Sequence, residues 1–188
     1  HSSSTSCRSS SSERSVVPVE NDAHVALVGL SGTGKSTVAP LLASRFGIHH
    51  VDVDEQVEAR CGTDVATVFA ARGEAVFRRA EHDALIDALG GDRSVIATGG
   101  GVVVDPRNRD LLRARSVVVW LRADVAEIVD RLDRSSVRRP LLAEDAGSSL
   151  RRLAEAREPL YRELADVVVD VTDRGPQQVV DQIVDALR

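Results

Sequence analysis

The feature that most constrains the fold of this chain is residues 29–37, which read Gly-Leu-Ser-Gly-Thr-Gly-Lys-Ser-Thr. The first eight positions fit the pattern G-x-x-x-x-G-K-[ST], a phosphate-binding P-loop. The apolar run from His24 to Val28 predicts a buried strand before the loop, and the helical spacing of apolar residues from Lys35 to Phe46 predicts a helix after it. Strand, loop and helix are the context that the motif requires, so we favour it over an ordinary Gly/Ser-rich turn.

Such a loop is built to hold the phosphates of a nucleotide. Its glycines let the backbone bend around an anion, and the N-terminus of the following helix adds partial positive charge. We expect Lys35 to reach the β- and γ-phosphates and the Ser36 hydroxyl to ligate Mg²⁺. The predicted nucleotide-binding residues of the loop are Gly32, Thr33, Gly34, Lys35, Ser36 and Thr37.

Composition limits the classes of protein to which the chain can belong. It has 188 residues, 43% of them hydrophobic, which is enough for one domain with a full core. We expect no membrane span, because no apolar run approaches the roughly 18 residues required, and no nucleic-acid partner, because the net charge is −5. Cys7 and Cys61 fit neither a disulfide framework nor a zinc site, so a reducing, cytoplasmic setting is expected.

The N-terminal segment differs in character from the rest. Residues 1–21 are rich in serine and have no hydrophobic periodicity, which predicts a disordered extension, either natural or added artificially. A transit peptide is the less favoured interpretation. Residues 22–188 then form a single domain.

Two aspartates follow the second predicted strand. The run from Ile48 to Val53 ends in Asp52-Val53-Asp54, and residues two apart on a strand point the same way. Both carboxylates are therefore expected at the carboxyl edge of the sheet, where ligands bind in open α/β folds. One would lie near magnesium and the other would accept a hydrogen bond from a hydroxyl; the alternative is a solvated acidic turn.

Two further stretches are candidates for ligand contact. In a helix predicted from Glu74 to Leu89, Arg78 and Glu81 are three residues apart; they form either an ordinary surface pair or a cleft arginine oriented by a glutamate. After a strand over 94–98, Gly99, Gly100 and Gly101 indicate close approach of a ligand or a tight turn.

The remaining pattern alternates strands with helices. Strands are predicted over 24–28, 48–53, 94–98, 117–121 and 166–171, and helices between them include one capped by Thr63 and one interrupted at Pro159. Residues 131–146 are arginine-rich and aperiodic, which suits a lid over phosphates, although a solvated loop is the alternative. Alternating strands and helices predict an α/β fold whose parallel sheet has helices on both faces.

Six ordered motifs resemble those of the shikimate kinase family. They are the P-loop at 29–37, Asp-Val-Asp at 52–54, Gly-Glu-Ala-Val-Phe-Arg-Arg-Ala-Glu at 73–81, Thr-Gly-Gly-Gly at 98–101, Arg-Pro-Leu-Leu at 139–142 and Arg-Glu-Pro-Leu-Tyr at 157–161. The resemblance extends from about residue 23 to the C-terminus. It implies a nucleoside-monophosphate-kinase-like P-loop fold with five parallel strands in the order 2-3-1-4-5, and transfer of the ATP γ-phosphoryl group to the 3-hydroxyl of shikimate.

The resemblance also implies roles for individual residues. The catalytic residues would be Lys35, Asp54 and Arg139; the acceptor would be held by Asp54, Arg78, Gly99, Gly100, Gly101 and Arg157; Mg²⁺ would be held by Ser36 and Asp52; and the nucleotide would also contact Arg131, Arg139 and Arg174. The partners would be ATP and shikimate, with the chain acting as a monomer. Two alternatives are another metabolite kinase of this fold, such as a gluconate kinase, and a nucleotide-binding module without catalysis.

Overall fold

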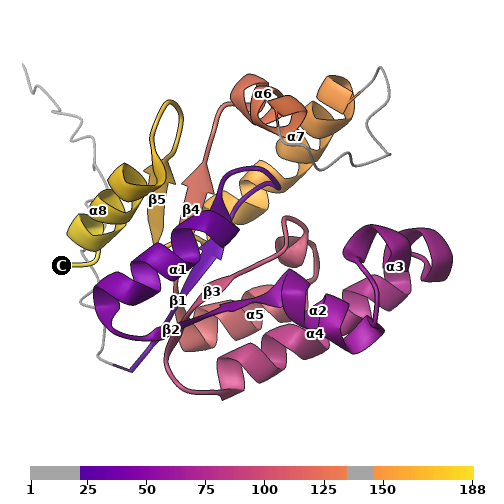
Figure 1. Cartoon of the computed structure of the whole chain (residues 1–188), viewed down its shortest axis with the longest axis horizontal. Helices are drawn as coiled ribbons and strands as arrows, with labels where there is room; N and C mark the ends of the chain where they lie inside the picture. The colour runs from indigo at the N-terminus through magenta and orange to yellow at the C-terminus, as the bar shows by residue number, and fades with distance from the viewer. Residues whose placement is uncertain (1–21, 135–145) are drawn as a thin grey trace, which may run out of the picture.

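Five parallel strands form the centre of the fold, in the order β2-β3-β1-β4-β5 (Figure 1). The computed structural model describes residues 22–134 and 146–188. The strands are β1 (His24–Val28), β2 (His49–Asp52), β3 (Ser94–Ala97), β4 (Ser116–Arg122) and β5 (Val167–Asp170). This is the strand order that the family resemblance implied, and it is confirmed.

The described helices surround this sheet. They are α1 (Lys35–Phe46), α2 (Val53–Cys61), α3 (Val65–Arg72), α4 (Glu74–Gly90), the 3₁₀ turn η1 (Val102–Val104), α5 (Pro106–Arg115), α6 (Val125–Arg134), α7 (Ala146–Leu164) and α8 (Pro176–Ala186). None of the helices in the described part of the chain is both long and apolar enough to cross a membrane.

Strand β1 lies at the centre of the sheet and is buried on both faces. Val25 and Leu27 pack into a core with residues of α1 and α8, whereas Ala26 and Val28 pack into a second core with residues of α4, α5 and α7. Because neighbouring residues of a strand point to opposite faces, an unbroken apolar run is what a doubly covered strand needs. The prediction of helices on both faces is therefore confirmed.

Helix α2 begins immediately after β2 and was not predicted from the sequence. Asp52 caps the helix, because its Oδ1 accepts hydrogen bonds from the backbone N–H groups of Asp54 (2.9 Å) and Glu55 (3.4 Å). Asp54 therefore lies in the first helical turn, and the argument that both aspartates share one side of a strand was wrong. The capping carboxylate and the acidic first turn favour a helix at this point over further strand.

Two smaller expectations also need correction. Helix α3 is capped by Asp64, whose Oδ1 accepts from the Thr67 N–H at 2.9 Å, and not by Thr63. Helix α7 continues through Pro159 without the expected interruption. Glu155 lies one turn before Pro159 and is exposed. Water can therefore donate a hydrogen bond to the Glu155 carbonyl, which the proline leaves without a backbone donor.

Candidate functional site

The loop between β1 and α1 has the backbone shape of an anion cradle. Gly29, Gly32 and Gly34 have φ angles of 141°, 90° and 91°, in a region that residues with side chains rarely adopt. A side chain at Gly29 would also clash with the carbonyl oxygen of Leu121 at the end of β4. The loop is thus fitted against the carboxyl end of the sheet and opens onto the N-terminus of α1, as predicted.

Lys35 is held directly over this loop. Its ammonium group donates hydrogen bonds to the carbonyls of Gly29 and Leu30, both at 2.8 Å, and only 7% of the residue is exposed. The Thr33 hydroxyl donates to the same Leu30 carbonyl at 2.9 Å. A buried cation held by neutral carbonyls can exchange these weaker partners for the oxygens of a phosphate.

Ser36 and Asp52 form the pair predicted for the metal. The Ser36 hydroxyl donates to Asp52 Oδ2 at 2.6 Å, while Asp52 Oδ1 caps α2. The two residues are sixteen positions apart in the chain and meet because α1 and β2 pack together. A hydroxyl and a carboxylate oxygen are hard ligands that suit Mg²⁺.

The three glycines after β3 lie where side chains would collide with the rest of the site. A Cβ at Gly99 would be 2.6 Å from Glu81 Oε1 and 2.7 Å from Asp54 Oδ1. A Cβ at Gly100 would be 2.9 Å from both the backbone nitrogen and the hydroxyl of Ser31 in the P-loop. The loop of 98–101 therefore touches the phosphate cradle on one side and two carboxylates on the other.

Arg78 faces this glycine loop. Its guanidinium occupies the space that a Cβ at Gly101 would take, and its Nη1 donates to Glu81 Oε2 at 2.7 Å. It also donates to Glu74 Oε1 at 3.3 Å and lies over the Phe77 ring, 5.3 Å from the centroid. Of the two interpretations left open by the sequence, a cleft arginine oriented by a glutamate is the one that the structure supports.

Burial and mutual contact shift the pKa values of Arg78 and Glu81. Desolvation raises the pKa of Glu81, which is 0% exposed, and the neighbouring Arg78 offsets only part of that rise. Desolvation lowers the pKa of Arg78, but Glu81 and Glu74 raise it by more, so its net pKa is above the usual value. Arg78 is therefore a fixed positive charge beside the glycine loop.

Two side chains of α7 meet the glycine loop from the opposite direction. Arg157 Nη1 donates to the Gly100 carbonyl at 3.0 Å, and the Tyr161 hydroxyl donates to the same oxygen. Tyr161 is 1% exposed and its ring stacks on Trp120, with centroids 5.7 Å apart. Arg157 was predicted from the sequence; Tyr161 was quoted only as part of a motif, because a lone tyrosine gives no signal of a contact 61 residues away.

A cavity of about 330 Å³ lies on the other side of the P-loop. It is lined by Gly32, Gly34, Thr37, Val171, Arg174 and Pro176, among others. Arg174 donates to the Asp170 carbonyl and to Gln182 Oε1. Arg139 lies outside the described residues, and so does the side chain of Arg131, whose backbone belongs to α6.

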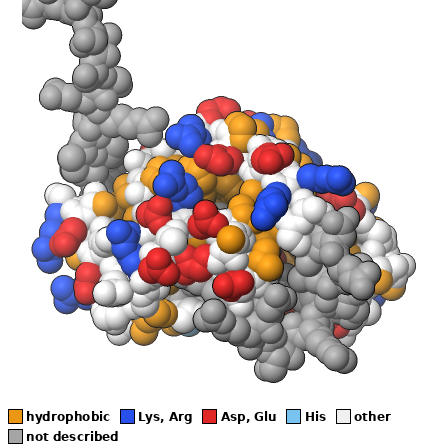
Figure 2. Space-filling model, turned by 90° about the horizontal axis from the view of Figure 1, so that it is seen from above, with side chains coloured by type: hydrophobic (Ala, Val, Ile, Leu, Met, Phe, Trp, Pro, Cys, Tyr) orange, Lys and Arg blue, Asp and Glu red, His pale blue; other side chains and the backbone are white. Residues whose placement is uncertain are grey.

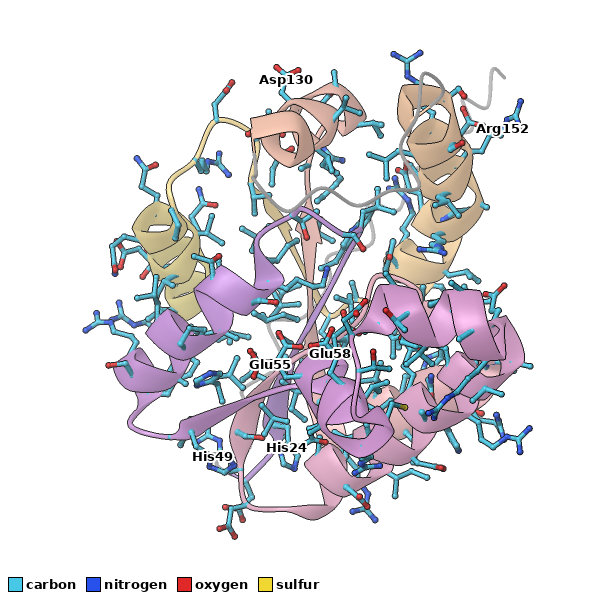
Figure 3. The ribbon with its side chains drawn as sticks, turned by 45° about the vertical axis from the view of Figure 1, so that its right-hand side comes forward. His24, His49, Glu55, Glu58, Asp130 and Arg152 are labelled. Atoms are coloured by element: carbon cyan, nitrogen blue, oxygen red, sulfur yellow. The ribbon has the colours of Figure 1, made fainter. Side chains whose placement is uncertain are left out.

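The charged and histidine side chains around the sheet are distributed differently at its two edges. Figure 3 shows Glu55 and Glu58 on α2 beside the carboxyl edge of the sheet, whereas His24 and His49 lie at its opposite, amino-terminal edge. Acidic and basic side chains are intermixed on the face seen from above, and its described side chains form no continuous basic surface of the kind that grips a nucleic-acid backbone (Figure 2).

The P-loop lies at the centre of a 2-3-1-4-5 parallel sheet, with the Ser36–Asp52 pair and the Arg78–Glu81 pair beside it. This arrangement defines a P-loop kinase of the nucleoside-monophosphate-kinase-like fold. The protein-family model described as "Shikimate kinase" matches residues 31–188. The chain belongs to the shikimate kinase family.

Individual relatives agree with this placement. A shikimate kinase of Hahella chejuensis is 42% identical over 173 residues, which cover 92% of this chain and 90% of that protein. A shikimate kinase of Halorhodospira halophila is 45% identical over 163 residues, which cover 86% and 92% of the two chains.

Solved structures give the same picture. The shikimate kinase of Acinetobacter baumannii in complex with shikimate has a TM-score of 0.83 and 32% identity, covering 88% of this chain and 93% of that one. A gluconokinase from Sinorhizobium meliloti, the type of enzyme kept as an alternative, has a TM-score of 0.59 and 18% identity, and it shares the fold alone.

Proposed function

We propose that this chain transfers the γ-phosphoryl group of ATP to the 3-hydroxyl of shikimate. The observation that carries the proposal is the convergence of Arg78, Arg157 and Asp54 on one glycine loop, which itself touches the P-loop at Ser31. Phosphate-binding and acceptor-binding residues that meet at one loop are what an in-line transfer requires, because catalysis of phosphoryl transfer consists mainly of positioning and charge neutralisation.

The P-loop side binds the nucleotide. Lys35 exchanges its two carbonyl partners for the β- and γ-phosphate oxygens. The N-terminus of α1, which follows the loop, adds partial positive charge beside the phosphates. Arg139 is proposed to neutralise charge on the transferred group, as the family resemblance implies. For the nucleotide base we propose the cavity beside Arg174, with Arg131 as a further contact.

Ser36 and Asp52 are proposed to hold Mg²⁺. The fit rests on the chemistry of the pair, a hydroxyl and a carboxylate 2.6 Å apart at the mouth of the P-loop. Mg²⁺ is commonly held by one or two carboxylates together with substrate phosphates and water, and no group of three His, Cys, Asp or Glu that could form a complete cage exists within residues 22–134 and 146–188. When bound, the ion would neutralise phosphate charge.

The acceptor side binds and orients shikimate. Arg78 and Arg157 approach the glycine loop from different helices, and two guanidinium groups suit a single carboxylate bound between them. Asp54 accepts a hydrogen bond from the attacking hydroxyl and takes up its proton as the new P–O bond forms and the bond between the γ-phosphorus and the ADP oxygen breaks. The backbone of Gly99, Gly100 and Gly101 contacts the ring hydroxyls.

The acceptor assignment is tested with Arg78→Ala and Arg157→Ala. Each variant should lower kcat/KM for shikimate by about 10² or more, because a substrate carboxylate that loses one of its guanidinium partners is poorly bound in a buried site. The KM for ATP should change little. Arg152→Ala removes an exposed charge from the same helix as Arg157 (Figure 3) and should behave as the unmodified protein.

The same assay distinguishes the alternatives. ADP release with shikimate but not with gluconate supports the proposal; release with gluconate would identify a different metabolite kinase; and no release with either would indicate a binding module. A variant that kept normal shikimate kinetics but lost ATP affinity would show that the arginine in question does not serve the acceptor.

We also infer that the chain acts as a monomer in the cytoplasm, where ATP is abundant. The residues proposed to bind the two substrates, from Lys35 to Arg157, all belong to this chain, so the proposed chemistry needs no second copy. Size-exclusion chromatography with light scattering tests this inference; a stable dimer that loses activity on dilution would contradict it.

A further inference from the structure

The Gly100 carbonyl lies between the P-loop and helix α7. Its residue touches Ser31 of the P-loop on one side, where a Cβ would lie 2.9 Å from the Ser31 nitrogen. On the other side the carbonyl oxygen accepts two hydrogen bonds from α7, one from Arg157 Nη1 at 3.0 Å and one from the Tyr161 hydroxyl. Gly100 itself is buried, so its oxygen depends on protein donors.

The two donors to the Gly100 oxygen differ in whether they also bind the acceptor. Under the proposed function, Arg157 must turn its guanidinium to the carboxylate of the acceptor. Tyr161 has no role in contacting the acceptor, because its ring is fixed on Trp120 and its hydroxyl, which also lies beside Arg157, is buried within the protein. A carbonyl held by Arg157 alone would be left without a donor whenever the guanidinium turned away from it towards the acceptor, and an unsatisfied buried carbonyl is costly.

We propose that Tyr161 is a positioning residue for the acceptor: its hydroxyl keeps the Gly100 carbonyl hydrogen-bonded while Arg157 is engaged by the substrate carboxylate. This inference rests on the proposed function, since it takes Arg157 as a carboxylate ligand. It assigns to Tyr161 a role in acceptor affinity without any contact between Tyr161 and the acceptor.

The test is Tyr161→Phe, which removes the hydroxyl and keeps the aromatic ring on Trp120. The KM for shikimate should rise about tenfold, the effect expected for one buried polar group left without a partner. The kcat and the KM for ATP should stay within about twofold of the unmodified values. A generally loosened protein would instead lose both substrates together, so the split between them separates positioning from stability.

Arg162→Ala is the matched control. Arg162 follows Tyr161 on α7 and lies over the same Trp120 ring, at 5.9 Å, but no contact of its side chain with Gly100 exists among the described residues. This variant should keep the unmodified KM for shikimate. An increase equal to that of Tyr161→Phe would attribute the effect to the Trp120 environment and overturn the proposal.

A double-mutant cycle with Arg157→Ala completes the test. In the Arg157→Ala background no arginine leaves Gly100 when the acceptor binds, so adding Tyr161→Phe should change kcat/KM for shikimate by less than about twofold. The same tenfold loss in both backgrounds would overturn the proposal, as would Tyr161→Phe with an unchanged KM. If the unmodified protein does not phosphorylate shikimate at all, the proposed function fails first, and that result is distinguishable from either of these.

Discussion

Tyr161 is the only tyrosine of the chain, and its burial makes its ionisation a probe of the site. Desolvation raises its pKa to about 12, with Arg157 opposing part of the rise. Because the pKa of the folded state lies above the ordinary value of 10, the group stabilises the fold fully below about pH 10, and this stabilisation is lost as the pH rises towards 12. A shift of this size corresponds to roughly 2–3 kcal/mol.

Alkaline titration followed by tyrosinate absorbance should therefore give an apparent pKa near 12 in the folded protein. Tyr161→Phe should lose less stability than the unmodified chain between about pH 10 and 12. Denaturant unfolding at several pH values in this range measures the difference. Ionisation of Tyr161 at the ordinary pKa, with the fold intact, would show that the ring is not buried as described.

At the scale of residues, sequence motifs predicted which residues belong to the site better than they predicted which residues contact one another. Lys35 was predicted because the P-loop pattern gives each position a role. The pairing of Arg78 with Glu81 stayed undecided, because a spacing of three residues is equally typical of a solvent-exposed pair. Tyr161 could not be predicted as a donor to Gly100, since the contact joins residues 61 apart and depends on how α7 packs.

At the scale of elements, Asp52 combines two tasks through its two carboxylate oxygens. One oxygen caps α2 and the other accepts from Ser36. A pair of substitutions separates these tasks. Asp52→Asn keeps a good capping group and should leave the free energy of unfolding within about 0.5 kcal/mol, whereas Asp52→Ala should lose about 1 kcal/mol.

Both variants remove the charge proposed to attract Mg²⁺. Both should therefore need a higher Mg²⁺ concentration for half-maximal activity, even though only one loses stability. Thermal unfolding without nucleotide and a Mg²⁺ titration of ADP release measure the two effects separately. A normal Mg²⁺ requirement in Asp52→Asn would exclude Asp52 from the metal site.

Strands and most helices were predicted, but α2 was not, and the reason is physical. Its nine residues are mostly polar and bury only Val53 and Val57, so hydrophobic periodicity is weak. The usable signal was at its start, where Asp52 is followed three residues later by Glu55, as at many helix N-termini. If Asp52 had been interpreted as a helix cap, the predicted strand would have ended at Asp52 and a helix would have been predicted from Val53, as the structure has it.

At the scale of the whole molecule, the serine-rich segment gives a prediction about stability. The family match begins at residue 31, and the described buried apolar residues begin at Val25. Removal of residues 1–15 should therefore leave the unfolding temperature unchanged, because a segment without apolar periodicity adds little to a core. Differential scanning calorimetry of both chains measures this, and a fall of several degrees would mean that the segment packs on the domain.

The central position of β1 has a consequence for how the protein is made. Val25 pairs with Val95 on one side and with Val117 on the other, so β1 waits during synthesis for partners about 70 and 90 residues later. Such distant pairings make folding slow and leave strand edges open in a growing chain. Gly29 moreover needs the Leu121 carbonyl beside it. A nascent chain that stops before β4 thus lacks a wall of its phosphate cradle, and the ability to bind ATP is acquired only once β4 has left the ribosome.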